Sequence, residues 1–294
     1  MTILSIVIPV YNAEKTIERT LRSLRVISQP ARDEVEAIIV DDGSSDKSME
    51  IVETKRHDFH PMRYITLKQA NQGLPSARNE GLKHCKGEWV LFLDADDELA
   101  FNPVPYLKEY PDNSSLGFSI KYFENLNFRS THRPVFVDLK NHLDVFTAKN
   151  AFTVSSVIFK KDRIKSIFDT RYFSLEDWLF WIENPLIFEK MKIFPDETSA
   201  IIHIHSESMT SDYTKLGIYR TKVAEKILTT LHEKLTHKQK NNLFIQAQIG
   251  LLLQGEKMKM KNFFRFPCDM TLFGKLIIFV VLRKNFSKLF IYGF

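Results

Sequence analysis

Strand and helix signals alternate through the first hundred residues, and this alternation constrains the fold more than any other feature. Short runs of β-branched and apolar residues predict strands at 4–8, 35–40, 63–67 and 89–93. Asn12 is placed to cap a first helix with apolar residues at 17, 21 and 24, and Pro75 suits the first turn of another. Strands separated by helices are typical of βαβ units, so we predict an α/β fold with a mainly parallel sheet flanked by helices.

The pattern is weaker after residue 100, where several prolines interrupt it. Strands are expected at 116–123, 155–159 and 200–204, and an aromatic-rich helix is expected at 173–187. From residue 216 to about 253 the sequence is helical in character. We therefore expect a catalytic domain at 1–215 and a helical C-terminal region at 216–294.

Positive charge is concentrated in the C-terminal tail. Residues 256–294 hold eight basic and two acidic residues in a chain whose net charge is +5. The basic residues alternate with bulky apolar ones, which favours an amphipathic segment on a membrane surface over a nucleic-acid groove. Its apolar centre, 276–282, is shorter than the roughly 18 residues of a membrane span. Packing of this tail on the catalytic domain is the alternative.

Three acidic pairs or clusters follow predicted strands or begin a predicted helix. They are Asp41-Asp42, Asp94-Ala95-Asp96-Asp97 and Glu176-Asp177. Clustered carboxylates repel one another unless a cation compensates for their charge. Ligands of open α/β sheets bind at the carboxyl ends of the strands, and hard divalent cations prefer oxygen ligands. The sequence therefore predicts Mg²⁺ or Mn²⁺ holding a diphosphate.

Five motifs in order and spacing resemble family-2 glycosyltransferases of the GT-A fold. They are SIVIPVYN at 5–12, VDDGS at 40–44, NQGLPSARN at 71–79, LDADD at 93–97 and LEDW at 175–178. The resemblance covers about residues 1–210. It implies an inverting transfer of a sugar from a nucleotide diphosphate donor, as in bacterial enzymes that act on lipid-linked oligosaccharides or surface polysaccharides.

The resemblance also implies roles for individual residues. Residues 9–11 resemble the segment that packs on the nucleotide base, Asp41 resembles the carboxylate that accepts the imino proton of the base, and Asp42 supports that loop. Helix capping is the alternative role for Asp41 and Asp42. Arg78 would pair with donor phosphate or with the acidic loop, with an exposed surface arginine as the alternative, and Asp94 would hold the ribose or the sugar. The full set of candidate nucleotide-sugar-binding residues is Pro9, Val10, Tyr11, Asn12, Glu14, Asp41, Asn71, Gly73, Arg78, Asp94 and Ala95.

The remaining roles concern the metal and the acceptor. Asp96 resembles the metal ligand, and His205 is a second candidate, with a structural histidine as the alternative. Asp177 resembles the base that takes the proton of the acceptor hydroxyl, with Glu176 orienting it. Trp178 is a candidate for stacking on an acceptor sugar, with packing in the core as the alternative. His203 lies two residues from His205 on a predicted strand, so both face one way, but a zinc site lacks further ligands.

We therefore expect an inverting, metal-dependent glycosyltransferase that moves one hexose from a UDP-sugar, and we take UDP-glucose as the first donor to consider. The acceptor would be a membrane-linked glycan such as an undecaprenyl-diphosphate-linked oligosaccharide, at the cytoplasmic face of the inner membrane. A lipopolysaccharide or capsule enzyme with another donor sugar remains open, as does a non-catalytic nucleotide-sugar-binding module. The Q-x-x-R-W motif of processive relatives is absent from this sequence, so one sugar is expected per catalytic event. A nucleotidyltransferase is disfavoured because the first strand leads into no Gly-rich phosphate loop.

Overall fold

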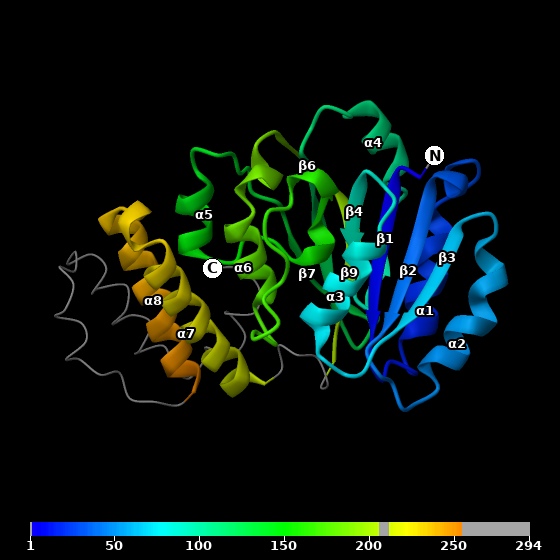
Figure 1. The fold of residues 1–294 in the computed structure, drawn as a ribbon, viewed down its shortest axis with the longest axis horizontal. Helices are drawn as coiled ribbons and strands as arrows, with labels where there is room; N and C mark the ends of the chain where they lie inside the picture. The colour runs from blue at the N-terminus through cyan, green and yellow to red at the C-terminus, as the bar shows by residue number, and fades with distance from the viewer. Residues whose placement is uncertain (1, 206–211, 255–294) are drawn as a thin grey trace. The chain divides into compact units, whose positions relative to one another are not determined.

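The computed structural model describes residues 2–205 and 212–254 (Figure 1). It divides into two compact units, one formed by residues 2–142 and 150–205 and the other by residues 143–149 and 212–254. The basic tail at 256–294 lies outside the described residues, and the domain boundary expected at residue 215 stays a prediction.

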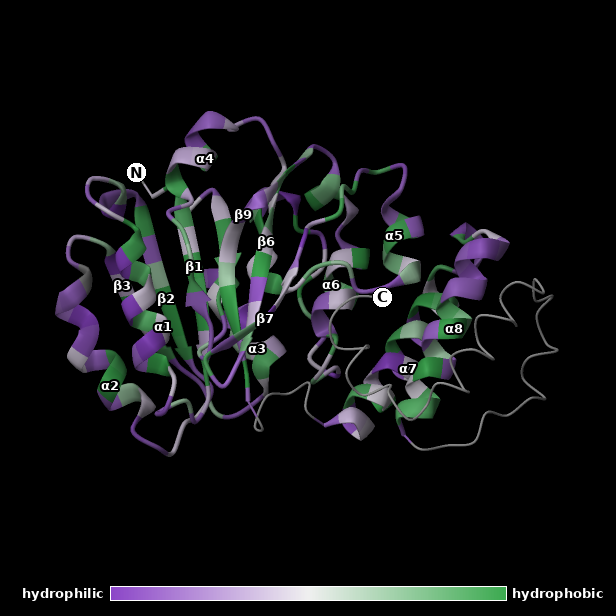
Figure 2. Ribbon diagram, turned by 180° about the vertical axis from the view of Figure 1, so that it is seen from behind, coloured by the Kyte–Doolittle hydropathy of each residue, from purple (hydrophilic) through white to green (hydrophobic). Residues whose placement is uncertain are grey.

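The first half of the sheet is parallel, as predicted. Its strands are β1 (Leu4–Val10), β2 (Val35–Asp41), β3 (Arg63–Lys68) and β4 (Trp89–Phe92), in the order β3-β2-β1-β4. Every residue of β1 and β2 is buried, which indicates that both faces of the sheet are covered. Figure 2 shows the hydrophobic colour running along these two strands. Their apolar runs explain why the sequence alone predicted them.

Helices cover the two faces of this parallel half. The strand β1 alternates, so that Ile6 and Ile8 share one buried cluster with Leu21 of α1 (Ile17–Ser23). On the opposite face, Val7 packs against α3 (Leu74–His84), where a Cβ added to Gly81 would lie 2.3 Å from a Val7 methyl carbon. The helix α2 (Ser48–Lys55) follows β2. This arrangement directs the loops after β1, β2 and β4 to one edge of the sheet.

The second half of the sheet is mixed. It is built from β5 (Glu98–Leu99), β6 (Ser115–Glu124), β7 (Asn127–His132), β8 (Val157–Lys160) and β9 (Met191–Ile204). From β4 the order continues β8-β6-β9-β5, with β7 paired to β6. The strand β8 is antiparallel to β4 and β6, whereas β6 and β9 are parallel. The strand expected at 200–204 is thus the end of a longer one, which brings that end beside β5. The short helix α4 (Val104–Glu109) joins β5 to β6.

The aromatic helix expected at 173–187 is shorter in the structure. The helix α6 (Glu176–Glu183) begins after Leu175, whose φ of 58° lies in the left-handed region. It ends at the buried Asn184, whose Oδ1 accepts the backbone N–H of Lys165 at 2.6 Å and whose Nδ2 donates to the Phe180 carbonyl at 2.7 Å. Asn184 thus connects the end of α6 to the segment at Lys165, and the sequence pattern does not reveal that contact.

The second unit contains α7 (Tyr213–Thr230), α8 (His237–Leu253) and most of α5 (His142–Ala148). The helical character expected from 216 to 253 is confirmed, with a break where Thr236 and Gln239 form a capping box for α8. The helices α7 and α8 pack closely, because a Cβ on Gly217 would lie 2.5 Å from the Gly250 carbonyl oxygen. Among the described helices, none has the length and apolar character needed to cross a membrane.

Candidate active site

Two adjacent carboxylates end β2, and they make different contacts. Asp41 is 1% exposed, and its Oδ1 accepts the backbone N–H of Ser44 at 2.8 Å. Its Oδ2 is buried and has no hydrogen-bond partner among the described residues. An unpaired buried carboxylate oxygen is costly unless a ligand donates to it. The geometry at Asp41 therefore suits the N–H of a bound nucleotide base.

Asp42 organises the next loop. Its Oδ1 accepts the backbone N–H of Gln72 at 2.8 Å and its Oδ2 accepts that of Gly73 at 2.8 Å. Gly73 has a φ of 88° and caps α3, where a Cβ would lie 2.6 Å from the Phe173 ring. Asn71, in the same loop, is exposed. Asp42 thus fixes the loop that carries the third sequence motif.

Asn12 joins the loop after β1 to the loop after β2. Its backbone N–H donates to Ser44 Oγ at 3.1 Å, and its Oδ1 accepts the backbone N–H of Ser45 at 2.9 Å. The expectation that Asn12 caps the first helix is wrong, because the N-cap of α1 is Thr16. The side chain of Asn12 instead holds the two loops together.

Glu14 strengthens the same connection. Its backbone N–H donates to Asp46 Oδ2 at 2.9 Å, and its Oε2 accepts the backbone N–H of Lys47 at 3.2 Å. In the segment before it, Pro9 and Val10 are buried in β1, whereas Tyr11 is 52% exposed. Of residues 9–11, Tyr11 is therefore the one whose ring is available for a planar base.

A buried arginine connects the acidic loop after β4 with the start of α6. Arg78, on α3, is 2% exposed, and its Nη2 donates to Asp94 Oδ1 at 2.7 Å. Its Nη1 donates to Glu176 Oε1. The two carboxylates raise the pKa of Arg78 further above its ordinary value, against the opposing effect of burial. Arg78 thus joins two predicted acidic motifs that are far apart in the sequence.

The acidic loop also contacts the end of β9. Asp96 Oδ2 lies 2.9 Å from His205 Nε2, and the buried Asp97 accepts the backbone N–H of His203 at 3.1 Å. Glu98 Oε1 lies 2.6 Å from His203 Nε2. The two histidines therefore face one way, as their spacing predicted. Burial, together with the charge of Asp94, raises the pKa of Asp96.

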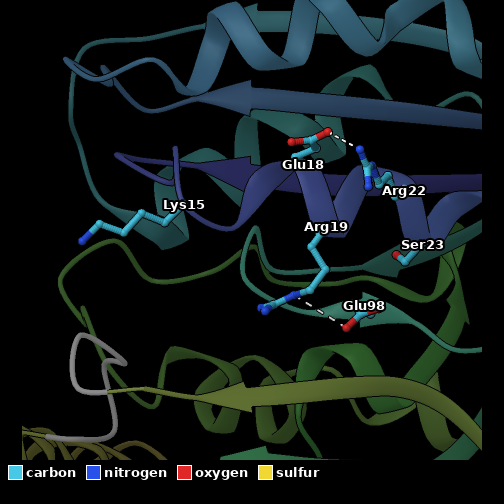
Figure 3. A pocket seen from close by; sticks show the side chains of 6 residues that line it. All are labelled: Lys15, Glu18, Arg19, Arg22, Ser23 and Glu98. Carbon is cyan, nitrogen blue, oxygen red and sulfur yellow. Dashed lines mark hydrogen bonds and ion pairs between the residues drawn. The ribbon is translucent and has the colours of Figure 1, made fainter. Parts of the chain in front are cut away.

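Arg19, which the sequence analysis did not single out, holds the acidic loop through its backbone. Its Nη2 donates to the Asp96 carbonyl at 2.6 Å, and its Nε lies 3.6 Å from Glu98 Oε1. The contact spans elements far apart in sequence, so no local pattern reveals it. Figure 3 shows Arg19 and Glu98 in a pocket beside this loop. The side chains lining that pocket are Lys15, Glu18, Arg19, Arg22, Ser23 and Glu98.

Asp96 and His205 are the two predicted ligands of a divalent cation, and they lie within 2.9 Å of each other. In residues 2–205 and 212–254, no group of three or more His, Cys, Asp and Glu side chains is arranged to hold a metal ion. Asp96 and His205 nevertheless converge, and their side chains are about one third exposed. Mg²⁺ usually binds one or two protein ligands and takes the rest from substrate phosphates and water. The donor set therefore fits a cation that arrives with a diphosphate.

Asp177 lies in the first turn of α6 and is the candidate base. Its Oδ1 accepts from Asn150 Nδ2 at 3.0 Å and from the backbone N–H of Trp178 at 2.8 Å. Desolvation and the neighbouring charge of Glu176 raise the pKa of Asp177 to about 7. A base is most effective when its pKa lies near the working pH. Asn150 was not predicted, because nothing in the sequence around it marks it as a partner of a residue in another element.

Burial decides between the two roles of Trp178 and limits the role of Ala95. Trp178 is 1% exposed and belongs to the core, so its ring is not available to stack on an acceptor sugar. Ala95 is 8% exposed and its side chain lies in the hydrophobic cluster, which leaves only its backbone for a donor. Alternation along the chain places Asp94 and Asp96 outward and Ala95 inward. The sequence does contain a sign that Trp178 is buried, because an apolar run follows it directly in the chain.

Comparisons with known proteins identify the family of this chain. Residues 5–176 match the model of the family described as glycosyl transferase family 2. The chain is 29% identical over 198 residues to a poly(ribitol-phosphate) beta-glucosyltransferase of Bacillus spizizenii, covering 66% of this chain and 31% of that protein. It is 24% identical over 217 residues to a GalNAc(5)-diNAcBac-PP-undecaprenol beta-1,3-glucosyltransferase of Campylobacter jejuni, covering 74% and 64%. The chain thus spans less than two thirds of the length of these relatives.

The fold is also shared with a solved structure. The crystal structure of Staphylococcus aureus TarS in complex with UDP superposes with a TM-score of 0.60 at 22% identity. The match covers 89% of this chain and 74% of that one. The expected GT-A fold is thereby confirmed.

Proposed function

Because the chain belongs to glycosyltransferase family 2, we propose that it transfers one hexose from a uridine diphosphate sugar to an acceptor hydroxyl, with inversion at the anomeric carbon. The observation that carries this proposal is the placement of Asp177. Its carboxylate has a pKa of about 7 and lies next to Glu176, which Arg78 connects to the acidic loop. A base whose pKa is about 7 is thus connected, through Glu176 and Arg78, to the loop that resembles the donor site.

The nucleotide is proposed to bind at the ends of β1 and β2. The unpaired Oδ2 of Asp41 would accept the imino N–H of uracil, and Tyr11 would cover one face of the ring. The TarS structure that shares this fold contains UDP. Asn12 and Glu14 would act indirectly, by holding the two loops together, while Asn71 and Gly73 border the site from the third motif.

The diphosphate is proposed to bind with Mg²⁺ or Mn²⁺ held by Asp96 and His205. Such a cation stabilises the negative charge that develops on the leaving nucleoside diphosphate. Arg19 and Asp97 would keep these two side chains together through the Asp96 carbonyl and the His203 N–H. Asp94, fixed by Arg78, would hold the ribose or the donor sugar.

The proposed reaction is a single displacement. The carboxylate of Asp177 takes the proton of the acceptor hydroxyl as the acceptor oxygen forms a bond to the anomeric carbon. The bond between that carbon and the phosphate oxygen breaks, and the nucleoside diphosphate leaves with the bonding electrons. Asn150 and the backbone N–H of Trp178 hold the Asp177 carboxylate in position, and the neighbouring charge of Glu176 helps to raise its pKa. In this reaction Asp177 accepts the proton of the acceptor hydroxyl, and no covalent bond forms between the protein and the sugar.

For the acceptor, we propose a membrane-linked or cell-surface glycan, with glucose as the transferred sugar. Both curated relatives are named as glucosyltransferases, one acting on poly(ribitol phosphate) and one on an undecaprenol-linked glycan. The tail at 256–294 would hold the enzyme at the cytoplasmic face of the membrane as a peripheral protein. Truncation after Gly255 tests this role. The truncated form should sediment with anionic liposomes much less than the full chain does, and equal sedimentation of the two forms would reject the tail as an anchor.

The experiment that tests the activity is nucleotide release from a panel of UDP-, GDP-, CDP- and dTDP-sugars. Purified protein is incubated with a membrane lipid extract and Mn²⁺ or Mg²⁺, and then with EDTA. Metal-dependent release from a UDP-sugar that requires Asp177 is the expected result. Binding of the UDP-sugar by calorimetry with no release under any condition would favour a non-catalytic binding module. No binding of any donor would overturn the nucleotide-sugar assignment.

A further inference from the structure

The hairpin between β6 and β7 has an unusual turn. Its two central residues, Asn125 and Leu126, have φ values of 49° and 64°, between the paired residues Glu124 and Asn127. Positive φ at both positions is typical of a type I′ turn, which favours Asn followed by Gly. Leucine in the left-handed region is disfavoured because its Cβ crowds the following carbonyl. The chain therefore keeps a bulky apolar side chain where glycine would fit the backbone better.

The apolar side chains at this tip are exposed. Leu126 is 78% exposed, the highest value among the exposed large hydrophobic residues of the described chain, and Phe128 is 56% exposed. The Phe128 ring packs edge-on against Phe123, with centroids 5.8 Å apart, so its position is fixed. A strained turn that displays a leucine next to an anchored phenylalanine forms a small apolar apex. We call residues 124–128 the hairpin tip.

Basic residues flank the hairpin tip. Lys121, Arg129 and Arg133 are exposed, and the acidic residue of this segment, Glu124, forms an ion pair with Arg129. The segment 121–133 therefore carries a net positive charge. An apolar apex with basic side chains further along the two strands of its hairpin is complementary to a bilayer surface that contains anionic lipids, because the apex enters the headgroup region while the basic residues meet phosphates.

We infer that the hairpin tip is a membrane-contact site, in which Leu126 and Phe128 enter the interfacial region of an anionic bilayer. The small size of the apex favours a bilayer over a protein partner. A stable protein interface buries about 1,000 Å² or more, whereas two projecting side chains offer far less. A bilayer does not need a shaped surface, because its headgroup region adapts to the inserted side chains.

The hairpin leaves the sheet at the same end as the candidate metal ligands. The strand β6 runs parallel to β9 up to the pair Glu124 and Ile204, and the Phe123 ring lies 6.2 Å from that of His203. The hairpin tip thus projects from the same end of the sheet at which His205 faces Asp96. A bilayer held by the tip would lie at the edge where the candidate metal ligands lie. The inference itself rests on the hairpin and holds whether or not the chain is a transferase.

Tryptophan fluorescence tests the contact directly in the full chain. The three native tryptophans, Trp89, Trp178 and Trp181, are at most 1% exposed, so they respond little to lipid. Leu126→Trp should shift its emission to the blue and be quenched by brominated lipid in vesicles of phosphatidylethanolamine and phosphatidylglycerol. The matched control is Ile167→Trp, at a site that is 60% exposed and lies elsewhere on the same unit. Equal responses of the two variants, or no response of Leu126→Trp, would overturn the inference.

A second variant separates lipid binding from folding. Leu126→Gly removes the apolar side chain and gives the turn its preferred residue, so the fold should be retained or stabilised. Its partition coefficient onto the same vesicles should fall about tenfold, as expected for loss of one inserted leucine. Ile167→Gly should partition like the wild type. Partitioning of Leu126→Gly equal to that of the wild type would reject the bilayer as the occupant, whether or not a protein is later found at the tip.

Discussion

The Nη2 of Arg78 lies 2.7 Å from Oδ1 of Asp94, inside a structure that leaves only 2% of the arginine exposed. The other terminal nitrogen of the same guanidinium donates to Glu176. One planar cation therefore neutralises two carboxylates that lie far apart in the sequence of the first unit. A lysine has the charge but not the fork geometry to bind both at once.

Replacing this cation should destabilise the fold. Arg78→Gln would leave Glu176 and Asp94 without their counter-ion, and removal of one partner from a buried ion pair costs on the order of 3 kcal/mol. Urea denaturation should show that loss of unfolding free energy. The control is Arg163→Gln, which breaks an exposed pair with Glu189 and should cost about 0.5 kcal/mol or less. Equal losses in the two variants would contradict the role of Arg78.

Removing the candidate base should separate binding from turnover. Asp177→Asn keeps the size of the side chain and its contact with Asn150, so the affinity for a UDP-sugar should be unchanged. Turnover should fall by about 10²- to 10⁴-fold, because no other group takes the acceptor proton. Calorimetry and nucleotide release measure the two quantities. Asp112→Asn, at an exposed site, serves as the control. Turnover near the wild-type value would show that Asp177 is not the base.

The rate of transfer should depend on pH through Asp177. Its pKa is raised to about 7, and only the ionised carboxylate accepts a proton. The kcat/KM for the acceptor should therefore fall about tenfold per pH unit below 7 and level off above it. A profile that is flat between pH 5 and 7 would argue against this assignment.

The same raised pKa has the opposite effect on stability. The folded protein holds the Asp177 proton more tightly than the unfolded chain does, so this group's contribution is fully present at low pH. It is lost as the pH rises from about 4 towards 7. Asp177→Asn should remove that part of the pH dependence, and unfolding curves recorded across this range would detect the difference.

Metal-dependent donor binding should require both Asp96, after β4, and His205, after β9. Asp96→Ala should lose the increase in UDP-sugar affinity that Mn²⁺ gives the wild type, and His205→Ala should reduce it. Titration of the donor with Mn²⁺ and with EDTA measures the increase. Asp196→Asn, an exposed acid on β9, should behave like the wild type. An unchanged metal effect in Asp96→Ala would remove Asp96 from the proposed ligands.

Periodicity and turn chemistry were sufficient to predict the parallel half of the sheet. Apolar runs marked β1 to β4, and acids at their ends marked Asp41, Asp94 and Asp96, because burial on both faces of a parallel sheet leaves a readable pattern. The second half was harder to predict. Whether β8 is antiparallel depends on pairing with strands distant in sequence, and no local signal encodes that pairing.

The supporting contacts of the site were also not predictable. Asn150 reaches Asp177, and Arg19 reaches the Asp96 carbonyl, across elements that only the tertiary fold brings together. The sequence left Trp178 between two roles for the related reason that one aromatic residue in an apolar helix looks the same whether it lines a cleft or fills the core. Its burial at 1% exposure decides the question.

The order of the strands has a consequence for how such a chain can evolve. Residues before 93 form the whole parallel half of the sheet, whereas the candidate base and its partner come from residues 150 and 177. Apart from His205, the residues proposed to bind the donor therefore lie in one stretch of the sequence, between residues 9 and 96. We expect that replacing the residues between that stretch and His205 would change the acceptor site and leave those donor-binding residues in place. Any such replacement would have to keep a carboxylate at position 176, because the buried guanidinium of Arg78 donates to it.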